Sequence, residues 1–364
     1  MSNLAPSAIP AAHGKRQGLI LLPPCTQNSN AYLKNLRATL AKDFDLFDIN
    51  DVRKQPWLLL TKIHAVYLNW IENAPGWRPL LQLLLLKMLG VRIVWTMHNK
   101  IPHHKTHPGW TAFFMTTLMR LCDAVVIHCR ESLEILPPHC RHKAHYLPLG
   151  NYIGNYPPPR VDLRRQLSIP PEQMVLLSLG SLKRYKNIEI LIEAFQAAAR
   201  PDIHLIVAGL PESDAYARDI GRLVGAKTHI HLDLRHIPDN DISAFMEAAD
   251  VFVSPLDLYS SLNSSAIILA FSFAKTVIAP QIGTLSDYDG QSSFFYSYTY
   301  CTPDEHVVML QATIQKAYDD FKARPEQLRQ WGQMAYEHVR TENDWEVFRP
   351  ALAQVCRGHW PHGR

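Results

Sequence analysis

The stretch VFVSPLDLYSSLNSSAIILAFSFAKTVIAPQIG, residues 251–283, combines two apolar strands with a helix between them. We expect the helix to begin at about Asn263, which puts Asn263, Ser264 and Ser265 where the first-turn amides have no intrahelical partner. These residues can cap the helix, and the free amides and the positive end of the helix dipole can also bind a phosphate. An ordinary N-cap between two buried strands is the alternative interpretation of this stretch alone.

The composition is that of a folded protein long enough for two domains. The chain has 364 residues, 47% of them hydrophobic and 19% charged, and a single core rarely extends much beyond about 250 residues. The formal net charge of +4 suits an anionic small ligand or an anionic membrane surface. It is too small to indicate nucleic acid as the partner.

Cysteine usage and hydropathy indicate a cytoplasmic protein without a membrane-spanning helix. The six cysteines are scattered and form no CxxC pair, so neither a zinc site nor a disulfide framework is expected. Residues 1–17 lack the pattern of a signal peptide and are predicted to be a disordered leader. The most apolar segment, residues 79–94, is interrupted by Lys87 and Arg92 and is too short to span a bilayer.

Strands and helices alternate along both halves of the chain, which predicts two Rossmann-like parallel-sheet domains in an α/β fold. The helix RPLLQLLLLKMLG is apolar on nearly every face, as is typical of a crossover helix buried against a sheet. A proline-rich linker at residues 157–163 separates the halves. We therefore expect an N-terminal domain over residues 18–158, a C-terminal domain over residues 164–335, and a helical tail over residues 336–364 that returns to the first domain.

Polar residues follow several expected strands of the first half. Ligands of open parallel sheets gather at the carboxyl ends of the strands, and three such ends present Asn28, Glu72 and His98. Asn28 and Asn30 can bind ligand hydroxyls or cap the helix that follows. No glycine lies in this first loop, so the dinucleotide-binding fingerprint is absent.

The segment after His98 is rich in histidine and leads into an aromatic helix. His98, His103, His104 and His107 share it with no Asp or Cys, so a metal cluster is not favoured. The helix that contains Trp110 is expected to bury its apolar face in the core. A membrane-contacting patch is the alternative, because aromatic side chains with flanking basic residues suit an interface.

The second half places cations opposite the capped helix. The strand MVLLSLGS ends in Gly180, and the loop after it carries Lys183, Arg184 and Lys186. Lysines in a loop are often only solvated. Here they follow a strand end, in the same domain as the helix at Asn263, and cations together with helix-end amides are what a diphosphate requires.

At these residues the sequence resembles the GT-B glycosyltransferases, and the resemblance covers nearly the whole chain. LGSLKRYKNIEILIEAF is similar to the loop in which a basic residue and a later lysine bind the donor diphosphate, and it implies that role for Lys183 and Lys186. HLDLRHIPDNDISAFMEAADVFVSP resembles the segment near the nucleotide base and ribose, which implies Arg235 and Ile237 there, with Gly180 of the preceding stretch also in the vicinity of the nucleotide. TMHNKIPH resembles the loop whose histidine, here His98, lies at the reaction centre.

The resemblance extends to a bacterial exopolysaccharide subgroup that includes the xanthan-type β-mannosyltransferases, through NSNAYLKNL, YLNWIE, LPLGNYIGNYP and NSSAIILAFSFAKTVIAP. One departure concerns two glutamates that retaining family-4 enzymes carry eight positions apart. Ser261 and Leu269 stand at these positions, so the donor sugar must be held by other groups, such as the turn from Asn263 to Ser265.

The resemblance implies a cytoplasmic glycosyltransferase that transfers a sugar from a nucleoside diphosphate sugar, GDP-mannose by analogy with the subgroup, to a glycan or lipid-linked saccharide. No DxD-like signature appears at a suitable strand end, and lysines with helix amides can neutralise the leaving diphosphate, so no metal or cofactor is expected. Inversion is favoured over retention, with Glu72 or His98 as the general base. The acceptor is expected near Asn28, Asn30, Tyr32 and Trp110.

Two other functions are compatible with this fold. A nucleotide-sugar epimerase would need the donor site without an acceptor channel. A catalytically silent binding subunit would account for the missing glutamates and for Asn187 and Ala274 at positions where glycine is usual in the family. Peripheral contact with the cytoplasmic face of the inner membrane is expected if the acceptor is lipid-linked.

Overall fold

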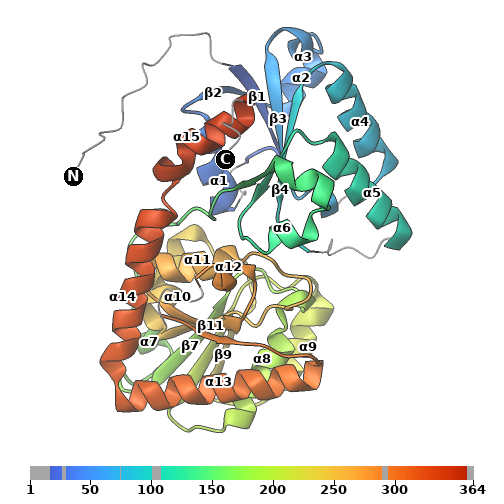
Figure 1. The fold of residues 1–364 in the computed structure, drawn as a ribbon. Helices are drawn as coiled ribbons and strands as arrows, with labels where there is room; N and C mark the ends of the chain where they lie inside the picture. The colour runs from blue at the N-terminus through green and yellow to red at the C-terminus, as the bar shows by residue number, and fades with distance from the viewer. Residues whose placement is uncertain (1–16, 27–29, 74, 101–107, 289–293, 359–364) are drawn as a thin grey trace, which may run out of the picture.

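The structure is a computed structural model that describes residues 17–26, 30–73, 75–100, 108–288 and 294–358. Of the predicted leader, it describes only Gln17, the first residue of β1. The chain forms two parallel sheets of six strands each (Figure 1). The predicted α/β fold class, with a C-terminal helix that packs on the first domain, is confirmed.

The first sheet has the strand order β2 (Phe44–Phe47), β1 (Gln17–Leu22), β3 (Ile63–Asn69), β4 (Arg92–Met97), β5 (Ala124–Ile127) and β6 (Ala144–Tyr146). One face is covered by α1 (Ala31–Leu40) and α15 (Trp345–Arg357). The other face is covered by α2 (Ile49–Lys54), α3 (Leu58–Thr61), α4 (Trp77–Met88) and α5 (Pro108–Leu121). The short helix α6 (Ser132–Ile135) follows β5.

The second sheet has the strand order β12 (Tyr296–Tyr298), β11 (Thr276–Pro280), β10 (Val251–Val253), β7 (Met174–Leu179), β8 (Ile203–Ala208) and β9 (Ile230–Asp233). One face packs against α8 (Ile188–Ala198), α9 (Asp214–Val224) and α13 (Pro303–Ala323). The other packs against α10 (Asp239–Ala248), α11 (Ser265–Ser272) and α14 (Pro325–Glu342). The short helices α7 (Leu163–Gln166) and α12 (Gly283–Ser286) complete the domain.

The central strands are buried along their whole length, as their continuous apolar sequences predict. Every residue of β7 and β8 is buried, since helices cover both faces of a parallel sheet. One hydrophobic cluster also runs from the α1 face of the first sheet to α10 and α11 of the second domain. The two domains therefore share part of their core beside the interdomain cavities.

The helix α4 differs from its prediction. Only Leu80 and Leu83 are buried in it, whereas Trp77, Leu81 and Met88 are 60%, 55% and 78% exposed. The helix turns one apolar stripe to the sheet and a second one to the surface. The expectation of a fully buried crossover helix was therefore wrong. In α5 the expected burial is confirmed for Phe114 and Leu118.

Candidate active site

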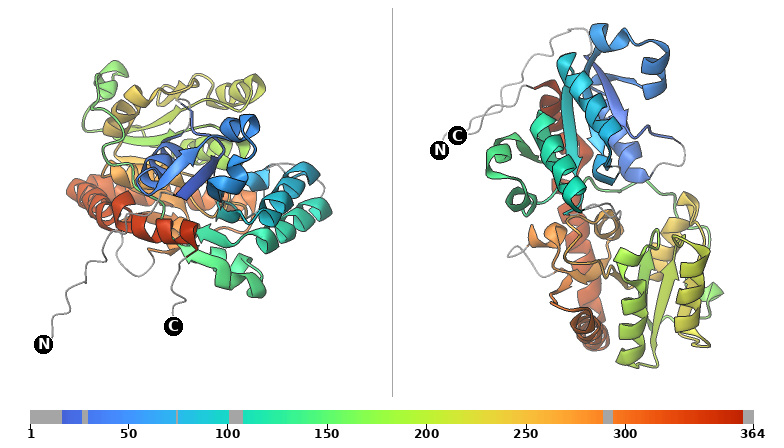
Figure 2. Two further views of the ribbon diagram at one scale, coloured as in Figure 1. Left: turned by 90° about the horizontal axis from the view of Figure 1, so that it is seen from above. Right: turned by 90° about the vertical axis from the view of Figure 1, so that its right-hand side faces the viewer.

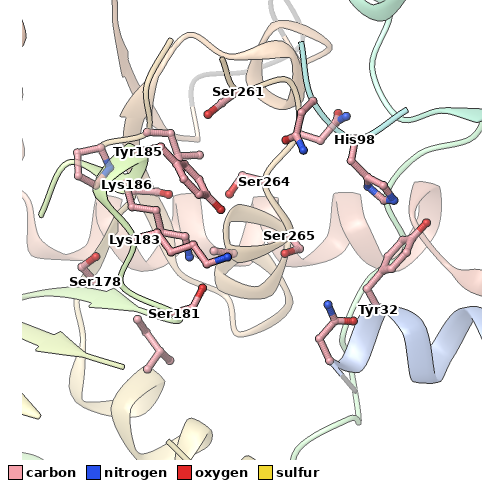
Figure 3. Close-up of a pocket in the computed structure, with 18 of the residues that line it drawn as sticks. Tyr32, His98, Ser178, Ser181, Lys183, Tyr185, Lys186, Ser261, Ser264 and Ser265 are labelled. Carbon is pink, nitrogen blue, oxygen red and sulfur yellow. The ribbon is translucent and has the colours of Figure 1, made fainter. Parts of the chain in front are cut away.

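Two adjoining cavities lie between the domains at the carboxyl ends of both sheets. The first has a volume of about 390 Å³ and the second about 880 Å³. Residues from both domains line each of them, and both share Asn30, Tyr32, Lys186 and Ser265. Figure 3 shows Lys183, Lys186, Ser264 and Ser265 on one side of a cavity and His98 and Tyr32 on the other. This is the arrangement expected from the strand-end rule.

The loop after β7 supplies two cations to the first cavity. Both Lys183 and Lys186 line it. The backbone of Gly180 has φ of +131°, and a Cβ there would lie 3.3 Å from Lys186 Nζ, so a glycine lets the ammonium group pass close to the strand end. Burial, with a smaller effect of the neighbouring Lys183, lowers the pKa of Lys186 to about 8. An anion bound here would stabilise the charged form of Lys186.

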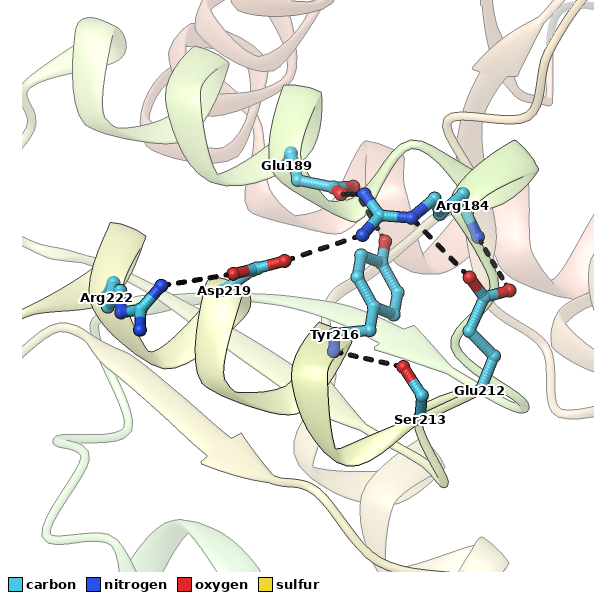
Figure 4. Close-up of polar contacts among 7 residues, drawn as sticks. All are labelled: Arg184, Glu189, Glu212, Ser213, Tyr216, Asp219 and Arg222. Atoms are coloured by element: carbon cyan, nitrogen blue, oxygen red, sulfur yellow. Dashed lines mark hydrogen bonds and ion pairs between the residues drawn. The ribbon is translucent and has the colours of Figure 1, made fainter.

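Arg184, expected beside these lysines, points away from the cavity. Its guanidinium pairs with Glu189 and Asp219, each at 3.4 Å, and with Glu212 at 3.6 Å (Figure 4). It also lies over the ring of Tyr216, 4.8 Å from the centroid. The acidic side chains that follow β8 attract it to the outer side of the loop, and Arg184 is not among the residues that line either cavity.

The amino-terminal end of α11 forms another part of the wall. The helix begins at Ser265, and Ser264 is its N-cap, with an Oγ that accepts a hydrogen bond from the amide of Ile267 at 3.4 Å. Asn263 lines the first cavity, and both polar atoms of its side chain are buried without a hydrogen-bond partner in the described structure. Buried amide groups are normally paired, so Asn263 is suited to a polar ligand.

On the first-domain side, His98 follows β4 and is held by its neighbours. The amide nitrogen of Asn69 donates to the carbonyl of Leu22 at 3.3 Å, which directs its oxygen to His98 Nε2 at 3.1 Å. This assigns the proton to Nε2 and leaves the lone pair on Nδ1. The indole ring of Trp70 stacks on the imidazole with centroids 4.6 Å apart. Burial, with a smaller effect of His128, lowers the pKa of His98 well below its usual value, so the ring is neutral at pH 7.

Tyr32 lies between His98 and a second buried histidine, with its ring edge-on to His98 and the ring centroids 5.4 Å apart. His128 Nδ1 lies 2.7 Å from the carbonyl of Leu147, which identifies it as the protonated nitrogen. The Tyr32 hydroxyl then donates to His128 Nε2 at 3.1 Å. Burial lowers the pKa of His128 to about 4 and raises that of Tyr32 above its usual value, so this group of side chains is uncharged at neutral pH.

Glu72, the other predicted general base, does not line the cavities as His98 does. It is 1% exposed, is absent from the residues that line the two cavities, and accepts a hydrogen bond from Trp95 Nε1 at 3.1 Å. Burial raises its pKa to about 6, although hydrogen bonds, one of them from the backbone of His98, lower it in part. The structure therefore separates the two residues predicted as general bases: His98 reaches the cavity, and Glu72 supports the loop behind it.

The other predicted residues are divided in the same way. Gly180 and Ile237 line the second cavity, whereas Arg235 is exposed and pairs with Asp233 at 2.9 Å. Asn30 lines both cavities but also caps α1, because its side chain accepts from the amide of Leu33. Trp110 packs on the hydrophobic cluster beneath α5. Asn28 lies outside the described residues, as do His103, His104 and His107.

Several cavity residues were missed from the sequence. Trp70, Tyr185 and Ser178 line the first cavity, and His236 lines the second. Their proximity to strand ends was the available signal.

Among the described residues, no group of three His, Cys, Asp or Glu side chains is arranged to hold a metal.

Comparison with known proteins identifies the second half of the chain. Residues 160–337 match the family described as glycosyl transferases group 1. The chain carries a glycosyltransferase group 1 domain. The matched span includes the loop with both lysines and the whole of α11.

The relatives and structural neighbours agree with a GT-B glycosyltransferase. The chain is 24% identical over 270 residues, 70% of either protein, to a GDP-mannose:glycolipid 4-beta-D-mannosyltransferase of Xanthomonas campestris pv. campestris. It is 26% identical over 216 residues, 53% of this chain and 48% of the relative, to a D-inositol 3-phosphate glycosyltransferase of Thermobispora bispora.

Solved structures with similar folds match nearly the whole length of this chain. Anabaena Alr3699/HepE in complex with UDP matches with a TM-score of 0.70 and 14% identity, over 94% of this chain and 100% of that one. Sucrose-phosphate synthase from Thermosynechococcus elongatus matches with a TM-score of 0.71 and 18% identity, over 94% and 99% of the two chains. At these identities the likeness establishes the fold alone.

Proposed function

We propose that this glycosyltransferase transfers mannose from GDP-mannose to a lipid-linked saccharide, as a step in the synthesis of a bacterial polysaccharide. The observation that carries the proposal is the first cavity, where Lys183, Lys186 and the end of α11 face His98 across the domain boundary. The donor is inferred from the activity for which the Xanthomonas relative is named, together with the length of that match.

The proposed reaction needs no metal. The ammonium groups of Lys183 and Lys186, with Asn263 and the capped end of α11, would bind the diphosphate and stabilise its charge as the glycosidic bond breaks. His98, neutral and with its lone pair on Nδ1, would accept the proton of the attacking acceptor hydroxyl. One direct displacement of this kind inverts the anomeric configuration. The nucleoside would occupy the second cavity, near Gly180 and Ile237.

The acceptor is proposed to enter from the first domain, past Tyr32 and Trp70. Since the acceptor carries a lipid, the enzyme would work as a peripheral protein on the cytoplasmic face of the inner membrane. None of the described helices is both long and apolar enough to cross a bilayer.

The test is transfer of radiolabelled mannose from GDP-mannose to a lipid-linked saccharide, with EDTA present. We expect a glycolipid product with inverted configuration, and thermal stabilisation by GDP in preference to UDP and ADP. Interconversion of nucleotide sugars without acceptor would instead identify the epimerase alternative. Nucleotide binding without turnover on any acceptor would identify the silent subunit. Stabilisation by UDP but not GDP would refute the proposed donor.

A further inference from the structure

The outer face of α4 and α5 carries a continuous apolar stripe that the fold does not use. In α4 the exposed residues are Trp77, Leu81, Leu84, Leu85 and Met88, with exposed fractions between 41% and 78%. Their spacing places them along one side of the helix, next to the side on which Leu80 and Leu83 are buried. Phe113 of the neighbouring α5 is 54% exposed. Contiguous exposed patches of this kind mark interaction surfaces.

The charge around this stripe is positive. Neither α4 nor α5 contains an acidic residue, whereas Arg78, Lys87 and Arg120 lie in them. In residues 53–122 the only Asp or Glu is the buried Glu72, against nine basic residues: Arg53, Lys54, Lys62, Arg78, Lys87, Arg92, Lys100, Lys105 and Arg120. Three of the nine have partners elsewhere: Lys87 pairs with Asp123, Lys100 pairs with Glu131, and Arg92 donates to the carbonyl of Val355 in α15, on the other face of the sheet. Since the whole chain has 37 Lys and Arg and 33 Asp and Glu, the remainder is net acidic. The exposed Arg78 and Arg120, in helices that contain no acidic residue, supply the positive charge beside the exposed leucines.

We infer that the α4–α5 face, the outer side of these two helices, is a docking surface for a bilayer of anionic phospholipid. Apolar side chains at helical spacing, flanked by basic residues, insert into the interface while the cations contact lipid phosphates. Trp77 and Arg78 show both features in adjacent residues, with the guanidinium 5.4 Å from the indole centroid. A second copy of the chain fits this face less well, because a symmetric pair would bring two basic surfaces together.

The place of this face in the fold deepens the proposed function, on which this part of the inference rests. The helices α4 and α5 cover one side of the first sheet (Figure 2), so the α4–α5 face points away from the sheet. The helix α5 follows β4 in the chain, and the carboxyl end of β4 also positions His98 at the first cavity. A bilayer on this face would therefore lie beside the first-domain wall. The lipid part of the acceptor could stay in the membrane while its sugar reaches His98.

The experiment is co-sedimentation of the full chain with vesicles of phosphatidylcholine alone and of phosphatidylcholine with roughly 30% phosphatidylglycerol, a composition chosen to give an anionic membrane surface. The wild type should bind the anionic vesicles at least about tenfold more strongly than the neutral ones, with binding reduced by salt. The double substitution Leu85→Ser with Met88→Ser should weaken binding about tenfold or more, and Arg78→Glu several-fold on anionic vesicles only. Because these side chains are exposed, the variants should keep the wild-type melting temperature.

The matched control is Val308→Ser with Val347→Ser, which changes two exposed valines of α13 and α15, 58% and 63% accessible. It should bind vesicles like the wild type. Equal vesicle binding by the wild type and the Leu85/Met88 variant would overturn the inference. The inference would also be overturned if the chain formed a dimer in solution, or captured an acidic protein, and the same substitutions abolished that association while vesicle binding stayed unchanged. GDP-induced thermal stabilisation, measured without vesicles, reports on the proposed function separately.

Discussion

At the residue scale, the charge of Lys186 connects the fold to donor binding. Its ammonium group is buried over Gly180 and has a pKa of about 8 because burial and Lys183 both disfavour the charged form. A diphosphate is fully ionised at that pH and requires the protonated lysine. Binding should therefore become weaker as the pH rises through the pKa of Lys186, by up to about tenfold per pH unit while charged lysine is the binding form.

This prediction is checked by the dissociation constant of GDP between pH 7 and pH 10. Lys186→Met should weaken GDP binding at pH 7 by about 10- to 100-fold, the effect of one charge-assisted hydrogen bond. The same substitution should remove the pH dependence of GDP binding near pH 8. In Lys183→Gln the pH dependence of GDP binding should remain and move to higher pH, because the repulsion of Lys186 by the second ammonium group is lost. An unchanged pH profile in Lys186→Met would show that another group is responsible.

His98 is predicted to act in the chemical step. Its replacement by alanine should lower kcat by about 10²- to 10⁴-fold, the usual contribution of a general base, with the affinity for GDP nearly unchanged. Glu72→Gln keeps the shape of the buried side chain and should lower kcat much less, because Glu72 does not line the cavities. Transfer rates and GDP thermal shifts measured on both variants make the comparison. A larger loss of kcat in Glu72→Gln than in His98→Ala would contradict it.

The sequence was informative about which loops form the site and less informative about which side chains enter it. Lys186 and Arg184 follow the same strand two positions apart, but Arg184 is drawn outward by Glu212 and Asp219, residues far along the chain. After β3, the backbone of Trp70 adopts φ of +51°, and Trp70 rather than Glu72 lines the cavity. A local pattern contains neither the partner in the tertiary structure nor this backbone conformation.

At the element scale, β7 and β8 approach each other so closely at their ends that glycine is required. Gly209 has φ of +147°, and a Cβ there would lie 1.7 Å from the carbonyl oxygen of Gly180. Gly209→Ala should therefore lower the free energy of unfolding by about 2 kcal/mol or more, and displace the loop that carries Lys186. Calorimetry and GDP binding test both effects.

Gly221→Ala is the matched control for this prediction. Gly221 lies inside α9, and a Cβ at this position would meet no atom within 4 Å beyond the helix itself. Alanine should stabilise the helix there by about 0.5–1 kcal/mol. Equal melting temperatures for the two variants would show that the contact between the strand ends can relax.

The orientation of α4 could not be predicted from its sequence. The helix carries two apolar stripes, and the sequence does not reveal which of them faces the sheet.

At the scale of the whole molecule, the two domains are joined where the chain crosses between them twice. The amide of Asn151 donates to the carbonyl of Asn343 at 2.8 Å, and the side chain of Asn343 donates to the carbonyl of Leu149 at 2.7 Å. Trp345 packs so closely on Gly150 that a Cβ there would lie 2.1 Å from the indole. These contacts hold the two crossings side by side.

Buried and half-buried histidines in both domains make the stability of the molecule depend on pH. Among the histidines that the structure describes, burial lowers the pKa of six below the usual value: His98, His128, His204, His231, His306 and His338. An unfolded chain protonates histidine near pH 6.5, so below that pH it binds more protons than the folded chain. The free energy of unfolding is then highest above pH 6.5 and falls as the pH drops toward 4. Burial also raises the pKa of Glu72 to about 6 and that of Asp287 above its usual value, and these two carboxyl groups oppose the trend of the six histidines.

His306 offers a test of this dependence away from the cavities. It is 1% exposed, its Nε2 lies 2.9 Å from the hydroxyl of Tyr298, and its pKa is lowered to about 4. His306→Gln can keep a hydrogen bond to that hydroxyl but does not titrate. Between pH 6 and pH 4.5, the fall in unfolding free energy should be shallower than in the wild type by up to about 1.4 kcal/mol per pH unit, the value for one proton. Urea denaturation across this range measures the slopes, and parallel curves for the two proteins would assign the acid sensitivity to other groups.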